Sequence, residues 1–164
     1  MTQSDFSSLP LNSNLLKSVA SLGYESMTAI QAQSLPHILA GQDVIGQGKT
    51  GSGKTAAFAL GMLEKLEVER YCIQSLVLCP TRELADQVTK EIRKIARTTP
   101  NVKVLTLCGG VPLRSQSESL QKGAHIIVGT PGRVEDHLNK ENLKLNFVST
   151  LVLDEADRML EMGF

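Results

Sequence analysis

The spacing of apolar residues along the chain switches between a helical period and short continuous runs. The helical period predicts helices over residues 12–22, 28–41, 54–66, 83–97, 113–121 and 133–139. The short runs predict strands at 43–46, 75–79, 102–107, 125–128 and 150–153. In the second helix, Thr28-x-x-Gln31 matches a capping box, Pro36 is expected to break or kink the helix, and Gly41 ends it.

Alternating helices and strands are typical of βαβ units, so the chain is predicted to be an α/β protein with a mostly parallel sheet. Apolar runs such as Leu76-Val77-Leu78 indicate strands covered by helices on both faces. Ligands of such sheets bind beyond the carboxyl ends of the strands. The residues that follow each strand are therefore the candidates for chemistry.

Composition narrows the class of protein. The 164 residues fit one domain, and 17 basic against 17 acidic side chains give a net charge of zero. A nucleic-acid site would therefore be a local patch. Cys72, Cys79 and Cys108 lack disulfide or zinc spacing and are expected to be ordinary thiols, which suits the cytoplasm. No stretch approaches the roughly 18 apolar residues of a membrane span.

A glycine-rich segment follows the first predicted strand and opens a helix. It reads Gly48-Lys49-Thr50-Gly51-Ser52-Gly53-Lys54-Thr55 and matches the P-loop pattern. The backbone N–H groups of 49–53 are expected to cradle phosphates, with the Lys54 ammonium near the β- and γ-phosphates and the Thr55 hydroxyl on Mg²⁺. The alternatives are a chance glycine-rich turn and a dinucleotide fingerprint at Gly46-x-Gly48-x-x-Gly51.

Two acidic residues end the last predicted strand. Asp154 is placed to hold Mg²⁺ largely through water, opposite Thr55, and Glu155 to orient or deprotonate an attacking water. With Lys54 they are the predicted catalytic residues. An apolar run followed by two acidic residues is common in proteins. The upstream P-loop is what favours a role in catalysis for this pair.

Asp154-Glu155-Ala156-Asp157 resembles the signature of the DEAD-box RNA helicases. Several further segments are similar to motifs of that family, in the same order. They are Phe6, the Q-motif-like run 23–31, Pro80-Thr81-Arg82-Glu83-Leu84, Gly109-Gly110 and Thr130-Pro131-Gly132-Arg133. The run Gln47-Gly48-Lys49 and the N-terminal stretch are most similar to the bacterial DbpA type, which acts on ribosomal RNA. Met27 and Gly48 depart from the usual proline and alanine.

The resemblance implies a RecA-like P-loop fold and an RNA-stimulated ATPase that separates short RNA duplexes. It implies that Gln31 binds the adenine edge and that Tyr24 lies at the nucleotide, although Gln31 also serves as a helix cap. For Phe6, a contact with the adenine and plain hydrophobic anchoring in the core are equally favoured interpretations. The residues implied to contact the RNA backbone are Pro80, Thr81, Arg82, Gly109, Gly110, Thr130, Pro131, Gly132 and Arg133. Without the other motifs, Thr130-Pro131-Gly132-Arg133 could equally be a turn that leads into a helix.

Against that family, the domain is expected to be incomplete at its C-terminal end. It divides into a Q-motif region, 1–41, and a P-loop core, 42–164. A Ser-Ala-Thr strand and a second RecA-like domain would be missing, so the isolated chain is expected to lack activity. It is also expected either to be marginally stable or to dimerise through unpaired sheet edges. The open alternatives are a P-loop ATPase that does not act on RNA, and a binding module without catalysis.

Overall fold

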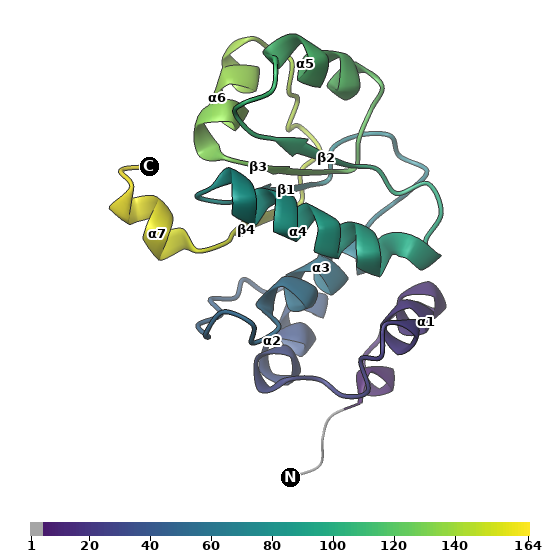
Figure 1. Ribbon diagram of the computed structural model, residues 1–164. Coiled ribbons are helices and arrows are strands. Elements are labelled where there is room, and N and C mark those ends of the chain that lie inside the picture. The colour runs from purple at the N-terminus through teal and green to yellow at the C-terminus, as the bar shows by residue number, and fades with distance from the viewer. Residues whose placement is uncertain (1–4) are drawn as a thin grey trace. The chain divides into compact units, whose positions relative to one another are not determined.

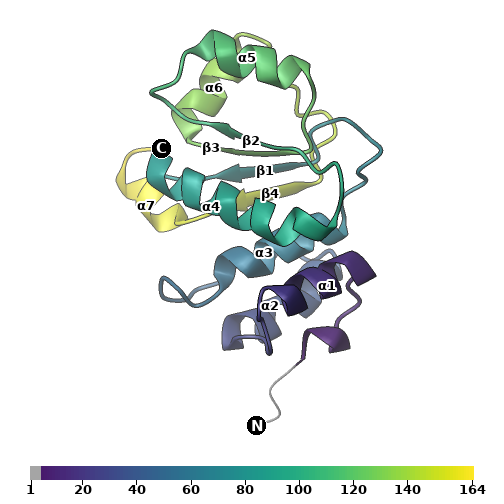
Figure 2. The ribbon, with the colours of Figure 1, turned by 45° about the vertical axis from the view of Figure 1, so that its right-hand side comes forward.

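The computed structural model describes residues 5–164, which form two compact units (Figures 1 and 2). The first unit is the chain up to Leu66 together with Glu91–Pro100. The second unit is Glu67–Lys90 together with Asn101–Phe164. The chain passes between them more than once, and the helix α4 (Arg82–Ile95) contributes to both.

The first unit is helical. Its elements are η1 (Phe6–Ser8), α1 (Ser13–Ser21), α2 (Ala29–Leu39), α3 (Lys54–Glu64), the last turn of α4, and η2 (Ala96–Thr98). Helices α2 and α3 approach closely, since a methyl group at Gly61 would lie 2.2 Å from Cγ2 of Ile38. The buried Ser18 hydroxyl donates to the Ile95 carbonyl over 2.6 Å and ties α1 to the end of α4. This packing fixes the helix that the phosphate loop opens.

Side-chain caps begin α1 and α2 where the sequence predicts them. Asn12 accepts the Leu15 amide at 3.0 Å, and Thr28 and Gln31 form both halves of the capping box. Gly41 then takes a left-handed φ of 81° just after α2. These starts and stops confirm the helices predicted over 12–22 and from Thr28, because each cap satisfies an amide that the first turn leaves unpaired.

Pro36 is predicted to break or kink α2, and the helix is not broken. The helix continues to Leu39, and the Ala40 amide still donates to the Pro36 carbonyl at 3.1 Å. Leu35 is fully buried and Ile38 packs against Gly61, so tertiary contacts hold the turns on both sides of the proline. Such contacts outweigh the roughly 3 kcal/mol that an interior proline costs a helix.

The second unit is an α/β sandwich around a parallel sheet. Its strands are β1 (Ser75–Leu78), β2 (Val104–Leu107), β3 (Ile126–Gly129) and β4 (Thr150–Leu153), in the order β2-β3-β1-β4. Its further helices are α5 (Leu113–Gln121), α6 (Pro131–Asn139) and α7 (Ala156–Glu161). Helix α4 covers one face of the sheet, and α5 and α6 cover the other (Figures 1 and 2). The predicted fold class, α/β with helices on both faces, is confirmed.

The core of this unit lies between the sheet and the α5–α6 layer. Its buried members are Leu76, Leu107, Ala124, Ile127, Val134 and Leu143. Gly129 lies where β3, β2 and α6 meet, and a methyl group there would lie 2.7 Å from the Leu107 carbonyl oxygen. The absence of a side chain at 129 thus lets α6 begin directly at the end of β3.

The connections that leave β1 and β3 run in opposite directions across the sheet. The connection from β1 through α4 leads toward β2, whereas the connection from β3 through α6 leads toward β4. Because right-handed crossovers in opposite directions use opposite faces, the chain leaves these neighbouring strands on opposite sides. The carboxyl ends of β1 and β3 therefore form a topological switch point, where ligands bind in open α/β sheets.

The prediction of a strand at 43–46 is wrong. Residues 42–49 have no regular structure in the described part of the chain, and Ile45 is fully exposed. A strand exists only through its ladder partners, and none of the four paired strands is hydrogen-bonded to this segment.

Strand β4 is an edge strand of the sheet. Among the described residues it pairs with β1 alone, and its side chains Leu151 and Leu153 are 59% and 52% exposed.

In the described range 5–164, we find no helix long and apolar enough to cross a membrane.

Candidate functional site: a phosphate loop and a polar sheet edge

The glycine-rich segment forms a loop that leads into the N-terminus of α3. Gly51 and Gly53 take left-handed φ values of 81° and 94°, a conformation that costs an L-residue about 1–2 kcal/mol and glycine little. Gly53 is the N-cap of α3, so the free amides of the first turn open toward the loop. This is the arrangement in which a helix N-terminus and successive backbone amides bind phosphate.

The Lys54 ammonium is folded onto the loop. It donates to the Gly48 carbonyl and, at 3.0 Å, to the Lys49 carbonyl. Both acceptors are neutral, whereas a phosphate oxygen is charged and forms a stronger charge-assisted bond. Lys54 is therefore held above the loop by contacts that an incoming phosphate can replace.

The loop also contains a buried hydroxyl that fits a phosphate. Ser52 Oγ is buried and has no hydrogen-bond partner among the described residues. A methyl group at Gly48 would lie only 2.8 Å from this oxygen, so glycine leaves the space beside it open. Buried polar groups are nearly always paired, and a bound anion would supply the missing acceptor.

The two residues predicted to hold Mg²⁺ each present an oxygen, one in each unit. The Thr55 hydroxyl belongs to the first turn of α3, and the Asp154 carboxylate follows β4. These hard oxygen donors suit a cation that keeps several of its waters. Within residues 5–164, no cluster of three or more His, Cys, Asp or Glu side chains forms an all-protein metal site.

Gln31 links the Q-motif-like segment to the phosphate loop. Its Oε1 accepts the Thr28 amide at 2.9 Å, and its Nε2 donates to the Gly53 carbonyl at 3.1 Å. The side chain is 4% exposed. Gln31 thus serves as the helix cap that the sequence predicts and also fixes the residue that precedes Lys54; its adenine role stays a prediction.

The two aromatic residues of the N-terminal segment are anchored inside the first unit. Phe6 is 2% exposed and lies 6.4 Å from the Tyr24 ring, measured between centroids. The Tyr24 hydroxyl donates to Glu91 over 2.5 Å, and burial together with this carboxylate raises the pKa of Tyr24 to about 12. These contacts favour the anchoring reading of Phe6, while a nucleotide contact for Tyr24 stays a prediction.

Three motifs meet at the carboxyl ends of β1, β2 and β3, which we call the sheet edge. Arg82 follows β1, Gly109 and Gly110 follow β2, and Thr130 follows β3. Gly110 has a left-handed φ of 81°, and a methyl group there would lie 2.4 Å from Arg82 Nη1. Arg82, Gly109 and Gly110 are exposed, so a guanidinium and a glycine backbone are presented side by side. Such groups bind phosphate without reading base sequence.

The other members of the predicted RNA set differ in exposure. Gly132 is exposed and Thr81, Thr130 and Pro131 are half-buried, whereas Pro80 is buried. The side chain of Arg133 is 15% exposed. Its guanidinium donates to Val111 and Gln116 rather than pointing into solvent.

The acidic pair lies at the end of β4. Asp154 is 9% exposed, and its amide donates to the Leu78 carbonyl at 2.9 Å. Burial raises the pKa of the neighbouring Cys79 thiol to about 12, and the negative charge of Asp154 adds to this shift. Glu155 has a left-handed φ of 50° and lies 3.4 Å from Arg158.

Comparisons with known proteins decide the family. The family model described as DEAD/DEAH box helicase matches residues 28–164, which is most of the chain. The chain belongs to this helicase family. The match contains the phosphate loop, the three motifs at the sheet edge and the acidic pair.

Relatives and a solved structure agree with this assignment. The chain is 59% identical over 149 residues to the ATP-dependent RNA helicase DbpA of Escherichia coli K12, covering 91% of this chain and 33% of that protein. It is 50% identical over 159 residues to the DEAD-box ATP-dependent RNA helicase CshA of Bacillus cereus ATCC 10987, covering 97% and 30%. A crystal structure of a DEAD box protein from Methanococcus jannaschii superposes with a TM-score of 0.92 at 41% identity, covering 97% of this chain and 43% of that one. The chain spans about a third of the length of these two relatives.

Sequence reasoning missed the polar residues beneath the sheet edge. Gln116 and His137 are buried at 7% and 0% exposure and hydrogen-bond to each other over 2.9 Å. In the sequence, Gln116 is one polar residue of the helix predicted over 113–121, and nothing local indicates that it is buried. His125 is also fully buried, and its Nε2 lies 2.8 Å from the Val68 carbonyl oxygen.

Proposed function

We propose that the protein containing these 164 residues is an ATP-dependent RNA helicase, an RNA-stimulated ATPase that separates short RNA duplexes. The observation that carries this proposal is the phosphate loop, with its left-handed glycines, its buried unpaired Ser52 hydroxyl and its bond from Gln31. Family membership and two relatives named as ATP-dependent RNA helicases support it. The exposed Arg82 and glycine backbone at the sheet edge supply a surface for RNA phosphates.

Within this proposal, Lys54 and the loop residues 49–53 hold the phosphates of ATP, and Gln31 and Tyr24 lie at the adenine. Mg²⁺ is held by Thr55 and Asp154, largely through water, and would neutralise charge that develops on the transferred phosphoryl group. Glu155 orients or deprotonates the attacking water. The RNA backbone lies along Thr81, Arg82, Gly109, Gly110, Thr130 and Gly132, flanked by Pro80, Pro131 and Arg133.

Ribosomal RNA as the substrate and a role in ribosome assembly rest on likeness to DbpA. A cytoplasmic location rests on the three cysteines without disulfide spacing, and the division into 1–41 and 42–164 rests on the positions of the Q-motif-like run and the P-loop. A second RecA-like domain of a longer chain would complete the motor and supply an arginine finger, which is worth about 10³–10⁵ in rate in P-loop enzymes that use one. The 164 residues alone are therefore proposed to bind nucleotide and to turn it over very slowly.

Titration with a fluorescent ADP analogue, with ATP and GTP as competitors, tests the nucleotide site. Lys54→Ala is compared with Lys65→Ala, which removes an exposed lysine at the other end of α3. The proposal expects ATP but not GTP to displace the probe, and expects Lys54→Ala alone to weaken binding at least tenfold. Equal competition by GTP would refute the adenine role of Gln31, and equal binding by both variants would refute the phosphate site.

The second candidate function, a P-loop ATPase that does not act on RNA, is tested at the sheet edge. It predicts that a longer chain of the relatives' length hydrolyses ATP equally with and without RNA. The helicase proposal expects RNA to stimulate turnover and Arg82→Met to weaken that stimulation. The exposed pair of Arg82 and Gly110 favours the helicase, because a motor that never meets a polyanion has no need of it.

We also propose that two copies of the 164-residue chain associate through β4. This strand pairs on one side only, so the amides of alternate residues face its open edge, and Leu151 and Leu153 add exposed apolar surface. Sedimentation of Leu153→Lys is compared with Leu160→Lys, an exposed leucine of α7. Association should be lost only in Leu153→Lys, and a monomeric unmodified chain at micromolar concentration would refute it.

A further inference from the structure

A buried glutamine links the motifs that the sheet edge presents. Gln116 of α5 donates from Nε2 to the Cys108 carbonyl at 2.9 Å. Its Oε1 accepts Arg133 Nη1 at 2.9 Å and His137 Nε2 at 2.9 Å. If the Gln116 amide were turned by 180°, its NH₂ group would face the donors Arg133 and His137. The three partners therefore fix the orientation of the amide. Cys108 directly follows β2, whereas Arg133 and His137 belong to α6.

His137 is suited to act as a donor in this network. It is fully buried, and Asn142 Nδ2 lies 3.4 Å from its Nδ1. Burial, followed by the charge of Arg133, lowers the pKa of His137. Because the Asn142 amide nitrogen is a donor, Nδ1 is the acceptor, and the proton of the neutral imidazole lies on Nε2, facing Gln116.

The glycine loop after β2 is held at both of its ends by this network. Gln116 binds the carbonyl of Cys108, just before the loop, and Arg133 Nη1 donates at 2.7 Å to the carbonyl of Val111, just after Gly110. Gln116 and Arg133 are themselves hydrogen-bonded. One linked pair of side chains thus sets the path of the exposed backbone between residues 108 and 111.

The opposite side of the loop faces Arg82. This guanidinium is exposed and lies against Gly110, whereas the Arg133 side chain is only 15% exposed and Arg133 Nε lies 3.4 Å from Asp136. The Nη1 and Nε atoms of Arg133 already have protein partners, and the side chain is largely covered, whereas Arg82 is exposed. The two arginines therefore have different roles at this edge.

We propose that Gln116 is a positioning residue of the RNA interface, and that Arg133 acts on RNA only through the Gly109–Gly110 loop. Arg82 is the arginine that meets the phosphodiester backbone. This inference rests on the proposed function and changes the role that family resemblance gives to Arg133. Without Gln116 the loop loses the bond at one end and Arg133 loses its neighbour, so the exposed amides no longer match the spacing of RNA phosphates.

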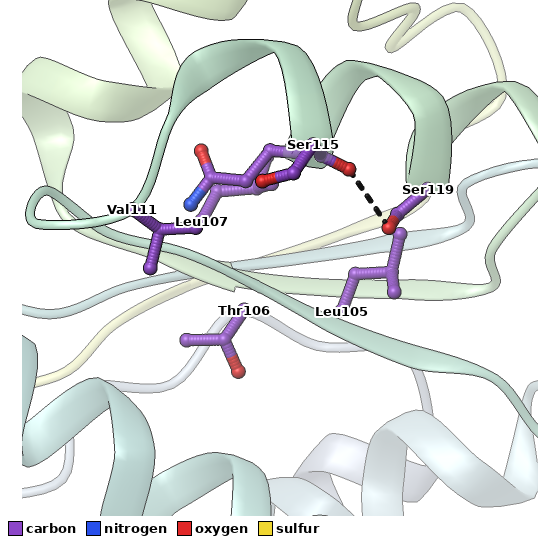
Figure 3. Close-up of a pocket in the computed structure, with 7 residues that line it drawn as sticks. Leu105, Thr106, Leu107, Val111, Ser115 and Ser119 are labelled. Carbon is purple, nitrogen blue, oxygen red and sulfur yellow. Dashed lines mark hydrogen bonds between the residues drawn. The ribbon is translucent and has the colours of Figure 1, made fainter.

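Gln116→Met removes both polar groups while keeping the length of the side chain. A cavity of about 190 Å³ between β2 and α5, which Gln116 helps to line, leaves room for the thioether (Figure 3). Figure 3 shows Leu105, Leu107 and Val111 beside this cavity, with the Ser119 hydroxyl bonded to the Ser115 carbonyl. The matched controls are Gln121→Met, at an exposed position of α5, and Ile126→Val, in the core at the far end of β3.

The test measures binding of a short fluorescent uridine oligonucleotide, by anisotropy over a series of salt concentrations, to a chain of the relatives' length that contains these 164 residues. Gln116→Met and Arg133→Met should weaken binding about tenfold without changing the slope of log K against log salt. Arg82→Met should lower that slope by about 0.7, the value for one phosphate contact on a single strand. The two controls should leave both affinity and slope unchanged.

A second readout needs no RNA. Amide resonances of Gly109 and Gly110 should shift in Gln116→Met and stay in place in Gln121→Met. Unshifted resonances, a reduced salt slope in Arg133→Met, or equal weakening by Ile126→Val would overturn the positioning role. If the unmodified chain binds no RNA at any salt, the proposed function fails and this role fails with it; if it binds and Gln116→Met binds equally, only the role fails.

Discussion

Gly53→Ala tests how tightly the phosphate loop and the Q-motif-like segment are joined. Gly53 has a φ of 94°, and an added methyl group would lie 2.5 Å from Nε2 of Gln31 and 2.9 Å from Oγ1 of Thr28. Gly41→Ala is the matched control. Gly41 has a similar φ of 81° in the same unit, and a methyl group there would meet nothing within 4 Å.

The expected magnitudes follow from these two environments. Both variants carry the left-handed penalty of an L-residue, about 1–2 kcal/mol. Both also gain the same small stabilisation from a less flexible unfolded chain, so this term cancels in the comparison. Only Gly53→Ala pushes Gln31 off the Gly53 carbonyl and leaves a buried amide unpaired, which costs about a further 1–3 kcal/mol.

Urea unfolding of the two variants, followed by circular dichroism, measures this difference directly. Gly53→Ala should lower the free energy of unfolding by about 1–3 kcal/mol more than Gly41→Ala does. It should also weaken binding of the fluorescent ADP analogue, whereas Gly41→Ala should not. Equal losses of stability with unchanged ADP binding would show that Gln31 does not hold the loop.

Three further changes test the packing and the polar network. Gly129→Ala places a methyl 2.7 Å from the Leu107 carbonyl oxygen and should lower the free energy of unfolding by about 1–3 kcal/mol in urea; a loss below about 0.5 would contradict the tight contact. Ser18→Ala removes the buried donor to the Ile95 carbonyl and should cost about 1–3 kcal/mol, while Ser18→Thr, if its hydroxyl keeps this bond, should cost less. Because the pKa of His137 is lowered in the folded state, the unfolded chain binds the proton more readily, so stability should fall as pH drops below about 6.5. Urea midpoints measured across that range should decline less in His137→Asn, and an equal decline would contradict the assignment.

Local sequence signals predicted helices α1 to α6 and the four paired strands, but not the short helix α7. Asn12 and the Thr28–Gln31 capping box act through hydrogen bonds within one turn, so a short stretch of sequence contains all the partners. The strand predicted at 43–46 failed for the opposite reason. Its formation depends on a neighbouring strand, and Val44 and Ile45 do not reveal whether such a neighbour exists.

In the candidate site too, local features could be predicted from the sequence, and features that depend on distant partners could not. The phosphate loop lies in one continuous run, and its geometry follows from glycines that the sequence displays. The network beneath the sheet edge joins Cys108, Gln116, Arg133 and His137, which come together only when α5 and α6 pack on the sheet. The exposed or inward orientation of an arginine was likewise beyond motif reasoning, as the contrast between Arg82 and Arg133 shows.

The most direct test of the central claim is ATP turnover by a chain of the relatives' length that contains these 164 residues. Turnover is measured with and without single-stranded RNA, in the unmodified protein and in Lys54→Ala, and in the 164-residue chain alone. We predict that RNA stimulates turnover of the unmodified long chain, that Lys54→Ala abolishes it, and that the short chain stays nearly inactive. Turnover that RNA does not change, or that survives Lys54→Ala, would contradict the account.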